Sequence, residues 1–217
     1  MKNFGENVPG YSIPVLNERE IRAAAGILFF ATFLSMMFIV FTENFIPLKF
    51  VLTFFFVDFI IRVFVGPKYS PTLIVGRFIV SNQTPEYVGA APKKFAWIIG
   101  LVLSFIMFLS FNVLNAYSPI SGIICLICLI FLFFESSFGI CLGCLFYPLF
   151  FKDEVLLCPG DVCEVKEKHE IQKISVTQVV VLLSFIAFIV ITSITMSEKF
   201  SVQPHDLFGE KSIEKTK

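Results

Sequence analysis

The sequence carries little charge for its length. Asp, Glu, Lys and Arg make up 16% of the 217 residues, whereas soluble domains carry about 25%. The 17 basic and 17 acidic residues cancel, so no basic excess indicates a nucleic-acid partner. With two histidines, no glycine-rich phosphate loop and no Ser/His/Asp arrangement, the sequence does not support a hydrolase, a kinase or a haem protein.

Apolar residues, in contrast, are abundant. They make up 56% of the sequence and include 29 phenylalanines, more rings than a soluble surface can hide. A helix needs about 20 apolar residues to cross a hydrocarbon core of about 30 Å, because lipid offers no partner for unpaired backbone groups. The composition therefore predicts an all-α integral membrane protein surrounded by a lipid bilayer.

Five apolar segments are long enough to span the membrane. Two of them share the stretch 95–134, which contains no charged residue and has turn-forming residues near its middle. The other three are residues 23–41, 45–65 and 174–196. We therefore predict a helical bundle with a four-helix membrane core over residues 1–150, a polar loop over 151–173, and a fifth transmembrane span with a tail over 174–217.

The connections between the spans predict the orientation. The connection 66–94 has one acidic residue, Glu86, and four basic ones: Lys68, Arg77, Lys93 and Lys94. The turns between spans one and two and between spans three and four offer only Lys49. By the positive-inside rule the connection 66–94 is cytoplasmic. The N-terminus and the loop 151–173 are then cytoplasmic too, and the C-terminal tail is external.

The most specific stretch begins with Glu135 at the end of the fourth span and continues to Cys141 and Cys144, which are flanked by glycines. Two cysteines three residues apart can reach disulfide distance after modest adjustment. We interpret them as a catalytic dithiol or a sulfur-carrying thiol, with packing as the alternative. A helix C-terminus disfavours a thiolate, but a break at Gly139 that restarts the helix at Cys141 would reverse this argument.

This stretch also resembles a known family. The run Glu-x-x-x-Gly-x-Cys-x-Gly-Cys-x-x-Tyr at 135–147 and the run Pro-Lys-Lys-Phe-Ala at 92–96 resemble the bacterial integral-membrane family known as domain-of-unknown-function family 4395. The resemblance covers about residues 17–150. It implies a four-helix core in the bacterial inner (cell) membrane and no agreed activity. The fifth span lies beyond it.

Two further cysteine pairs carry weaker signals. Cys158 and Cys163 flank a Pro-Gly turn in the polar loop, so one hypothesis is a zinc or iron–sulfur site held by four thiolates, namely Cys141, Cys144, Cys158 and Cys163. Free thiols or a simple disulfide are the alternatives. Cys125 and Cys128 lie mid-span among apolar residues, where a thiol behaves as a small packing group.

Three charged residues fall inside the expected spans. Asp58 and Arg62 are four residues apart and can pair on one helical face. With Glu135 they predict a polar pocket in which Arg62 binds an anion and Glu135 moves a proton. The alternative is a structural network that ties spans two and four together, because unpaired charges in a bilayer are costly.

Three functional hypotheses remain from the sequence. The leading one is a cytoplasm-facing thiol site for redox or sulfur transfer with a soluble thioredoxin-like or sulfur-carrier protein. The second is a transporter for a small anion or sulfur compound. The third is a structural membrane protein with a metal-binding cysteine cluster. The sequence assigns neither an enzymatic reaction nor a cofactor.

Overall fold

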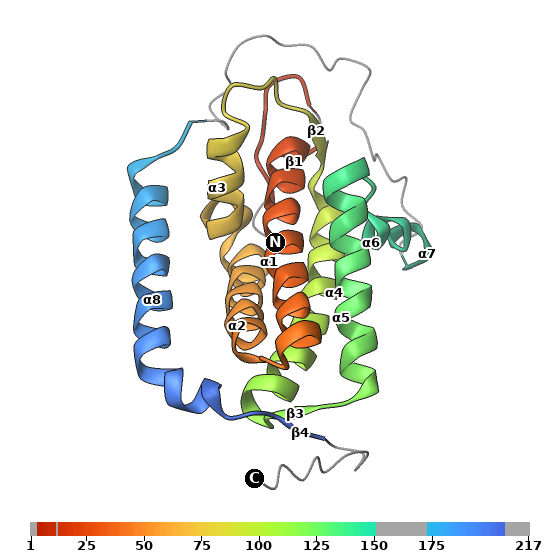
Figure 1. Ribbon diagram of the computed structural model, residues 1–217. Helices are drawn as coiled ribbons and strands as arrows, with labels where there is room; N and C mark the ends of the chain where they lie inside the picture. The colour runs from red at the N-terminus through yellow and green to blue at the C-terminus, as the bar shows by residue number, and fades with distance from the viewer. Residues whose placement is uncertain (1–3, 12, 151–172, 207–217) are drawn as a thin grey trace, which may run out of the picture.

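A computed structural model describes residues 4–11, 13–150 and 173–206 and shows a bundle of long helices (Figure 1). The long helices are α1 (Glu18–Thr42), α2 (Ile46–Ile60), α4 (Ala90–Phe108), α5 (Pro119–Phe133) and α8 (Val176–Ser201). Helix α1 lies at the centre and contacts α2 and α5, while α8 lies at one edge against α2 and α3.

Three of these helices continue into a π-helical turn. The turns are η1 (Ile61–Val65) after α2, η3 (Leu109–Val113) after α4 and η4 (Phe134–Phe138) after α5. Such turns are rare in proteins as a whole, and those that occur are often found at functional sites. Arg62 lies in η1 and Glu135 in η4, so both residues sit where the helical ladder is locally widened.

Four helices in the described residues are long and apolar enough to cross a membrane. They are Glu18–Thr42, Ala90–Val113, Pro119–Phe138 and Val176–Ser201. The protein is therefore a membrane protein of the all-α class, as predicted. The expected second span, α2 with η1, is not among the four, because it carries three charged residues: Lys49, Asp58 and Arg62.

Short elements follow α2 and α5 toward the same end of the bundle, the end with β1 and β2 (Figure 1). Between α2 and α4 the chain forms η2 (Pro67–Tyr69) and α3 (Pro71–Ile79), and after α5 it forms α6 (Leu142–Leu145) and α7 (Tyr147–Phe150). Helix α3 begins at Pro71 and is capped by Ser70, whose hydroxyl accepts a hydrogen bond from Leu73 N, as is usual for an N-cap.

Two short strand pairs join distant parts of the chain. β1 (Val15–Asn17) pairs antiparallel with β2 (Tyr87–Gly89), and Glu18 N donates to Glu86 O at 2.7 Å. This pairing sets the first turn of α1 beside the first turn of α4. At the other end of the bundle, β3 (Ala116–Tyr117) pairs parallel with β4 (His205–Asp206) (Figure 1).

Apolar side chains lie both inside the bundle and on its outer surface, as expected for a protein in lipid. One buried apolar cluster includes Leu28, Phe59 and Trp97. A second, nearer the β3–β4 end, includes Met107 and Cys125. Large apolar side chains also cover the outside of the bundle, as expected for a surface that faces hydrocarbon rather than water.

Candidate functional site

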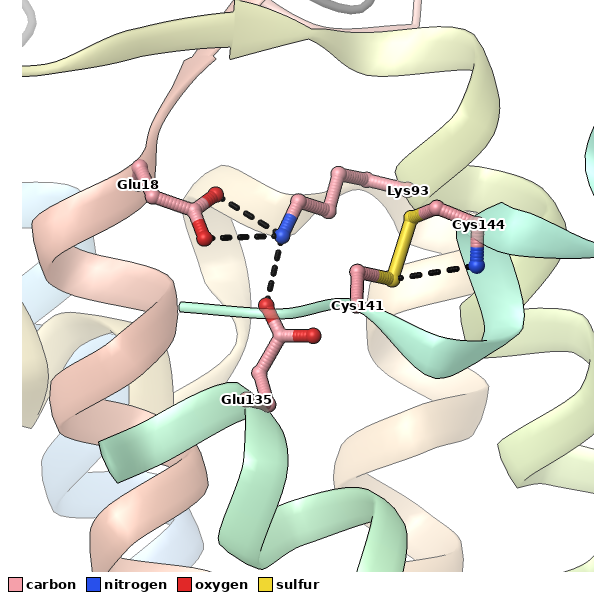
Figure 2. The surroundings of a disulfide bond; sticks show 5 residues. All are labelled: Glu18, Lys93, Glu135, Cys141 and Cys144. Atoms are coloured by element: carbon pink, nitrogen blue, oxygen red, sulfur yellow. Dashed lines mark hydrogen bonds and ion pairs between the residues drawn. A yellow bond between two sulfur atoms is a disulfide. The ribbon is translucent and has the colours of Figure 1, made fainter. Parts of the chain in front are cut away.

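Cys141 and Cys144 are joined by a disulfide bond, with their Cα atoms 5.1 Å apart (Figure 2). Gly139 adopts a left-handed conformation, with φ 68°, and ends the helix after η4. The chain then restarts as α6 with Cys141 as its N-cap, and Cys141 Sγ accepts a hydrogen bond from Cys144 N at 3.3 Å. The helix break considered at Gly139 is therefore present.

The two sulfur-bearing residues differ in accessibility. Cys144 is buried, with 6% of its surface exposed, whereas Cys141 is partly exposed. The burial of Cys144 follows from close packing of α6 on α4, where a Cβ on Gly143 would lie only 2.7 Å from Ala96 Cβ. Cys141 is therefore the sulfur-bearing residue that a reaction partner reaches more easily.

A buried ion cluster lies beside the disulfide (Figure 2). Lys93 Nζ lies 2.5 Å from Glu135 Oε1 and 2.7 Å from Glu18 Oε2. These residues come from α4, η4 and the start of α1, and all three side chains are at most 14% exposed. A buried charge needs such pairing to offset its loss of water, so the cluster fixes the three segments against one another.

Arg22 of α1 contacts the chain where η4 ends, next to the ion cluster. Its Nη2 donates to Ser137 O at 3.3 Å, and its side chain passes alongside Gly139. A cation at a helix C-terminus interacts favourably with the carbonyl ends there. Arg22 thus helps to hold the backbone in place where the helix ends and the cysteine segment begins.

Asp58 and Arg62 form the predicted ion pair, with Arg62 Nε 2.8 Å from Asp58 Oδ2. Ser70 Oγ and Thr72 N donate to Asp58 Oδ1 at 2.8 and 3.0 Å, and Arg62 also donates to the Thr72 hydroxyl. Arg62 and Asp58 are almost fully buried. The pair therefore ties α2 and η1 to α3, whereas Glu135 joins α4 and α1.

The residues predicted to share one polar pocket thus belong to two separate networks, but a cavity brings some of them together. A space of about 70 Å³ is lined by Arg62, Glu135 and Cys141, and also by Cys128 and aromatic rings of α2, α4 and α5. Asp58 and Cys144 are not part of its lining. At about 10–15 Å³ for each water by this measure, the cavity has room for a few water molecules.

The remaining cysteines divide into two groups. Cys158 and Cys163 lie outside the described residues, so the four-thiolate site stays a prediction. Across residues 4–11, 13–150 and 173–206, no group of three or more His, Cys, Asp or Glu side chains is arranged to hold a metal. Cys125 and Cys128 are free thiols, and Cys125 packs in an apolar cluster, which fits the packing role predicted for this pair.

Sequence reasoning missed Lys93 and Glu18 as partners of Glu135. Lys93 lies in the Pro-Lys-Lys-Phe-Ala run at 92–96 and in the basic connection 66–94, where its charge indicates only the orientation. Glu18 lies in the polar segment just before the first apolar segment, 23–41. The available signal was that an acidic residue at the end of an apolar span needs a cation from another segment.

The family model described as "Domain of unknown function (DUF4395)" matches residues 16–152. The chain belongs to this family. The match confirms the resemblance seen in the sequence and covers α1 to α7, with the ion cluster and the disulfide, whereas α8 lies beyond the DUF4395 match. Comparison with curated proteins and with solved structures gave no match.

Proposed function

We propose that this protein is a membrane thiol–disulfide exchange protein whose Cys141–Cys144 pair reacts with a soluble thioredoxin-like or sulfur-carrier protein. One observation carries the proposal. The two sulfurs are bonded to each other at a helix break at one end of the bundle, with Cys141 partly exposed and Cys144 buried. An accessible sulfur backed by a buried resolving sulfur is the arrangement that dithiol exchange needs.

The thiol–disulfide exchange needs no cofactor, because the partner dithiol supplies the two electrons. A thiolate of the partner attacks Cys141 Sγ, the Cys141–Cys144 bond breaks, and Cys144 leaves as a thiolate that takes a proton. The partner's second thiolate then attacks its own sulfur in the mixed disulfide and releases Cys141, which is protonated. The partner dithiol is oxidised by two electrons and the cysteine pair is reduced by two.

The redox state of the pair gives the direct test. Purified protein is equilibrated with glutathione buffers from reducing to oxidising, and its free thiols are alkylated and mapped by mass spectrometry. We expect the Cys141 and Cys144 peptides to change together as a two-electron couple, while Cys125 stays reduced because it is buried. A pair that stays fully oxidised or fully reduced across the whole range would contradict the proposal.

The membrane arrangement in this proposal has five spans, with α2 and η1 as the second. The 15 residues of α2 and the 5 of η1 give about 30 Å of helix at 1.5 Å per residue, enough to cross the hydrocarbon core. Its three charged residues, Lys49, Asp58 and Arg62, are at most 2% exposed. Their side chains form hydrogen bonds or ion pairs with other protein groups. Lys49 Nζ, for example, donates to Asn115 Oδ1 and Val202 O, both at 2.6 Å.

The charge distribution supports a cytoplasmic location for the disulfide end, in a bacterial inner membrane. The described basic residues of α1, α3 and the first turn of α4 lie at that end: Arg19, Arg22, Arg77, Lys93 and Lys94. The end with β3 and β4 has Lys49 and Lys199. By the positive-inside rule the N-terminus is then cytoplasmic and the C-terminus external.

Reporter fusions test this topology. Alkaline phosphatase, which is active only outside the cytoplasm, should be active when fused after α8 and inactive when fused before α1. Green fluorescent protein, which fluoresces when folded in the cytoplasm, should give the opposite pattern. Fluorescence from a fusion after α8 would mean an even number of spans and would remove the argument for five.

A further inference from the structure

We propose that Glu135 carries the proton of Cys141 during thiol–disulfide exchange and that Lys93 positions Glu135 for this step. The inference rests on the proposed function and deepens it. It narrows the sequence prediction that Glu135 moves a proton to one proton donor, the Cys141 thiol.

Geometry provides the first argument. Glu135 and Cys141 line the same cavity, although a helix end separates them in the chain. The bond to Lys93 is made by Glu135 Oε1, and Figure 2 shows the second carboxylate oxygen on the side of Cys141. One oxygen thus anchors the side chain, and the other lies on the side of the cysteine in this view.

Charge provides the second argument. Lys93 contributes one positive charge, and its two partners, Glu18 and Glu135, contribute two negative charges. The cluster can therefore accept one proton without acquiring a net positive charge, which favours uptake in a poorly hydrated site. Arg62 is bonded to Asp58, and Arg22 to a backbone carbonyl.

The titratable and charged groups around Glu135 come from every element that packs near it. They are Lys93 of α4, Glu18 and Arg22 of α1, Arg62 of η1, Cys128 of α5, and the cysteine pair of α6. Of the two carboxylates bonded to Lys93, Glu135 lines the cavity and Glu18 does not. Glu18 therefore contributes charge to the cluster without facing the cysteine, whereas Glu86, which pairs with Arg19 outside the cavity, is the matched control.

Cys141 must lose its proton when the exchange runs in the reverse direction, in which the protein's own dithiol is oxidised. The Cys141 thiol gives its proton to Glu135 through the cavity, and the Cys141 thiolate attacks a sulfur of the partner's disulfide. That disulfide breaks, one partner sulfur leaves as a thiolate, and a mixed disulfide forms. The Cys144 thiol gives its proton to that partner thiolate, and the Cys144 thiolate attacks Cys141 Sγ. The second partner sulfur leaves as a thiolate and takes the proton from Glu135. The partner disulfide is reduced by two electrons and the cysteine pair is oxidised by two.

The test measures how fast Cys141 of the fully reduced protein reacts with iodoacetamide, an uncharged reagent, from acidic to alkaline pH, with the modified peptide quantified by mass spectrometry. We expect Glu135→Gln to slow the reaction at neutral pH by about ten-fold or more, because a positioned proton acceptor contributes about 10²–10⁴-fold in favourable cases. The difference should vanish at alkaline pH, where solvent removes the proton. Glu86→Gln, which removes a carboxylate outside both the cluster and the cavity, should react at the wild-type rate.

Glu135→Gln reacting as fast as the wild type, or faster, overturns the inference. A faster reaction is what a purely electrostatic role predicts, because removing a negative charge favours the thiolate. Glu135→Asp keeps a carboxylate and should slow the reaction less than Glu135→Gln, which provides a second test if the glutamine variant is unstable. No partner protein is present, so the result is independent of whether Cys141 exchanges with one.

Discussion

A Cys144→Ala variant is expected to accumulate a mixed disulfide between Cys141 and the partner protein, whereas the wild-type chain shows almost none. In the wild type, Cys144 attacks the mixed disulfide and resolves it. Without Cys144 that second step is lost, and the intermediate survives until an external thiol reduces it. Membranes from cells that express the variant, quenched in acid and run on non-reducing gels, should show a band that disappears after reduction.

The matched control is Cys141→Ala, which leaves the buried Cys144 and should trap little partner. Because Cys128 borders the same cavity as Cys141, the experiment is repeated in a Cys128→Ala background to remove a second internal thiol. Equal trapping by both single variants would mean that burial does not distinguish the two sulfurs. No trapping by either would remove the thiol–disulfide exchange proposal itself.

The parts of this site that the sequence predicted are those set by local spacing. Cys141 and Cys144 are three residues apart, and Gly139 before them is free to adopt a left-handed conformation, so the helix break and the approach of the sulfurs follow from a few neighbouring residues. The Asp58–Arg62 pair is also local, since residues four apart share a helical face. The long apolar segments could also be predicted, because each is a continuous run of neighbouring residues.

The parts that the sequence did not predict depend on contacts between distant segments. Lys93 meets Glu18 because β1 pairs with β2, and three-residue strands show no hydrophobic pattern to recognise. Asp58 meets Ser70 and Thr72 because the chain turns back at Gly66, with φ 143°, before α3. The division of the expected polar pocket into two networks follows from these two non-local contacts.

Arg62→Ala is expected to lower the stability of the protein by about 3–5 kcal/mol, the range for removing one partner of a buried ion pair. The loss is large because Asp58 is 0% exposed and would keep a charge without its cation. Thermal unfolding in detergent, followed by circular dichroism, should show a clearly lower Tm. The matched control is Arg19→Ala, which breaks a pair with Glu86 whose side chains are 31% and 43% exposed and should cost about 0–1 kcal/mol.

The double variant Arg62→Ala/Asp58→Ala separates a structural role from an anion-binding role for Arg62. If the pair is structural, removing both charges should recover part of the lost stability, because no unpaired charge then stays buried. If Arg62 instead serves as the anion site of a transporter, Arg62→Ala should keep the wild-type Tm and lose uptake of a small anion into proteoliposomes. Since Arg62 bonds Asp58 and the Thr72 hydroxyl, we expect the first result: Arg62 stabilises the join between α2, η1 and α3.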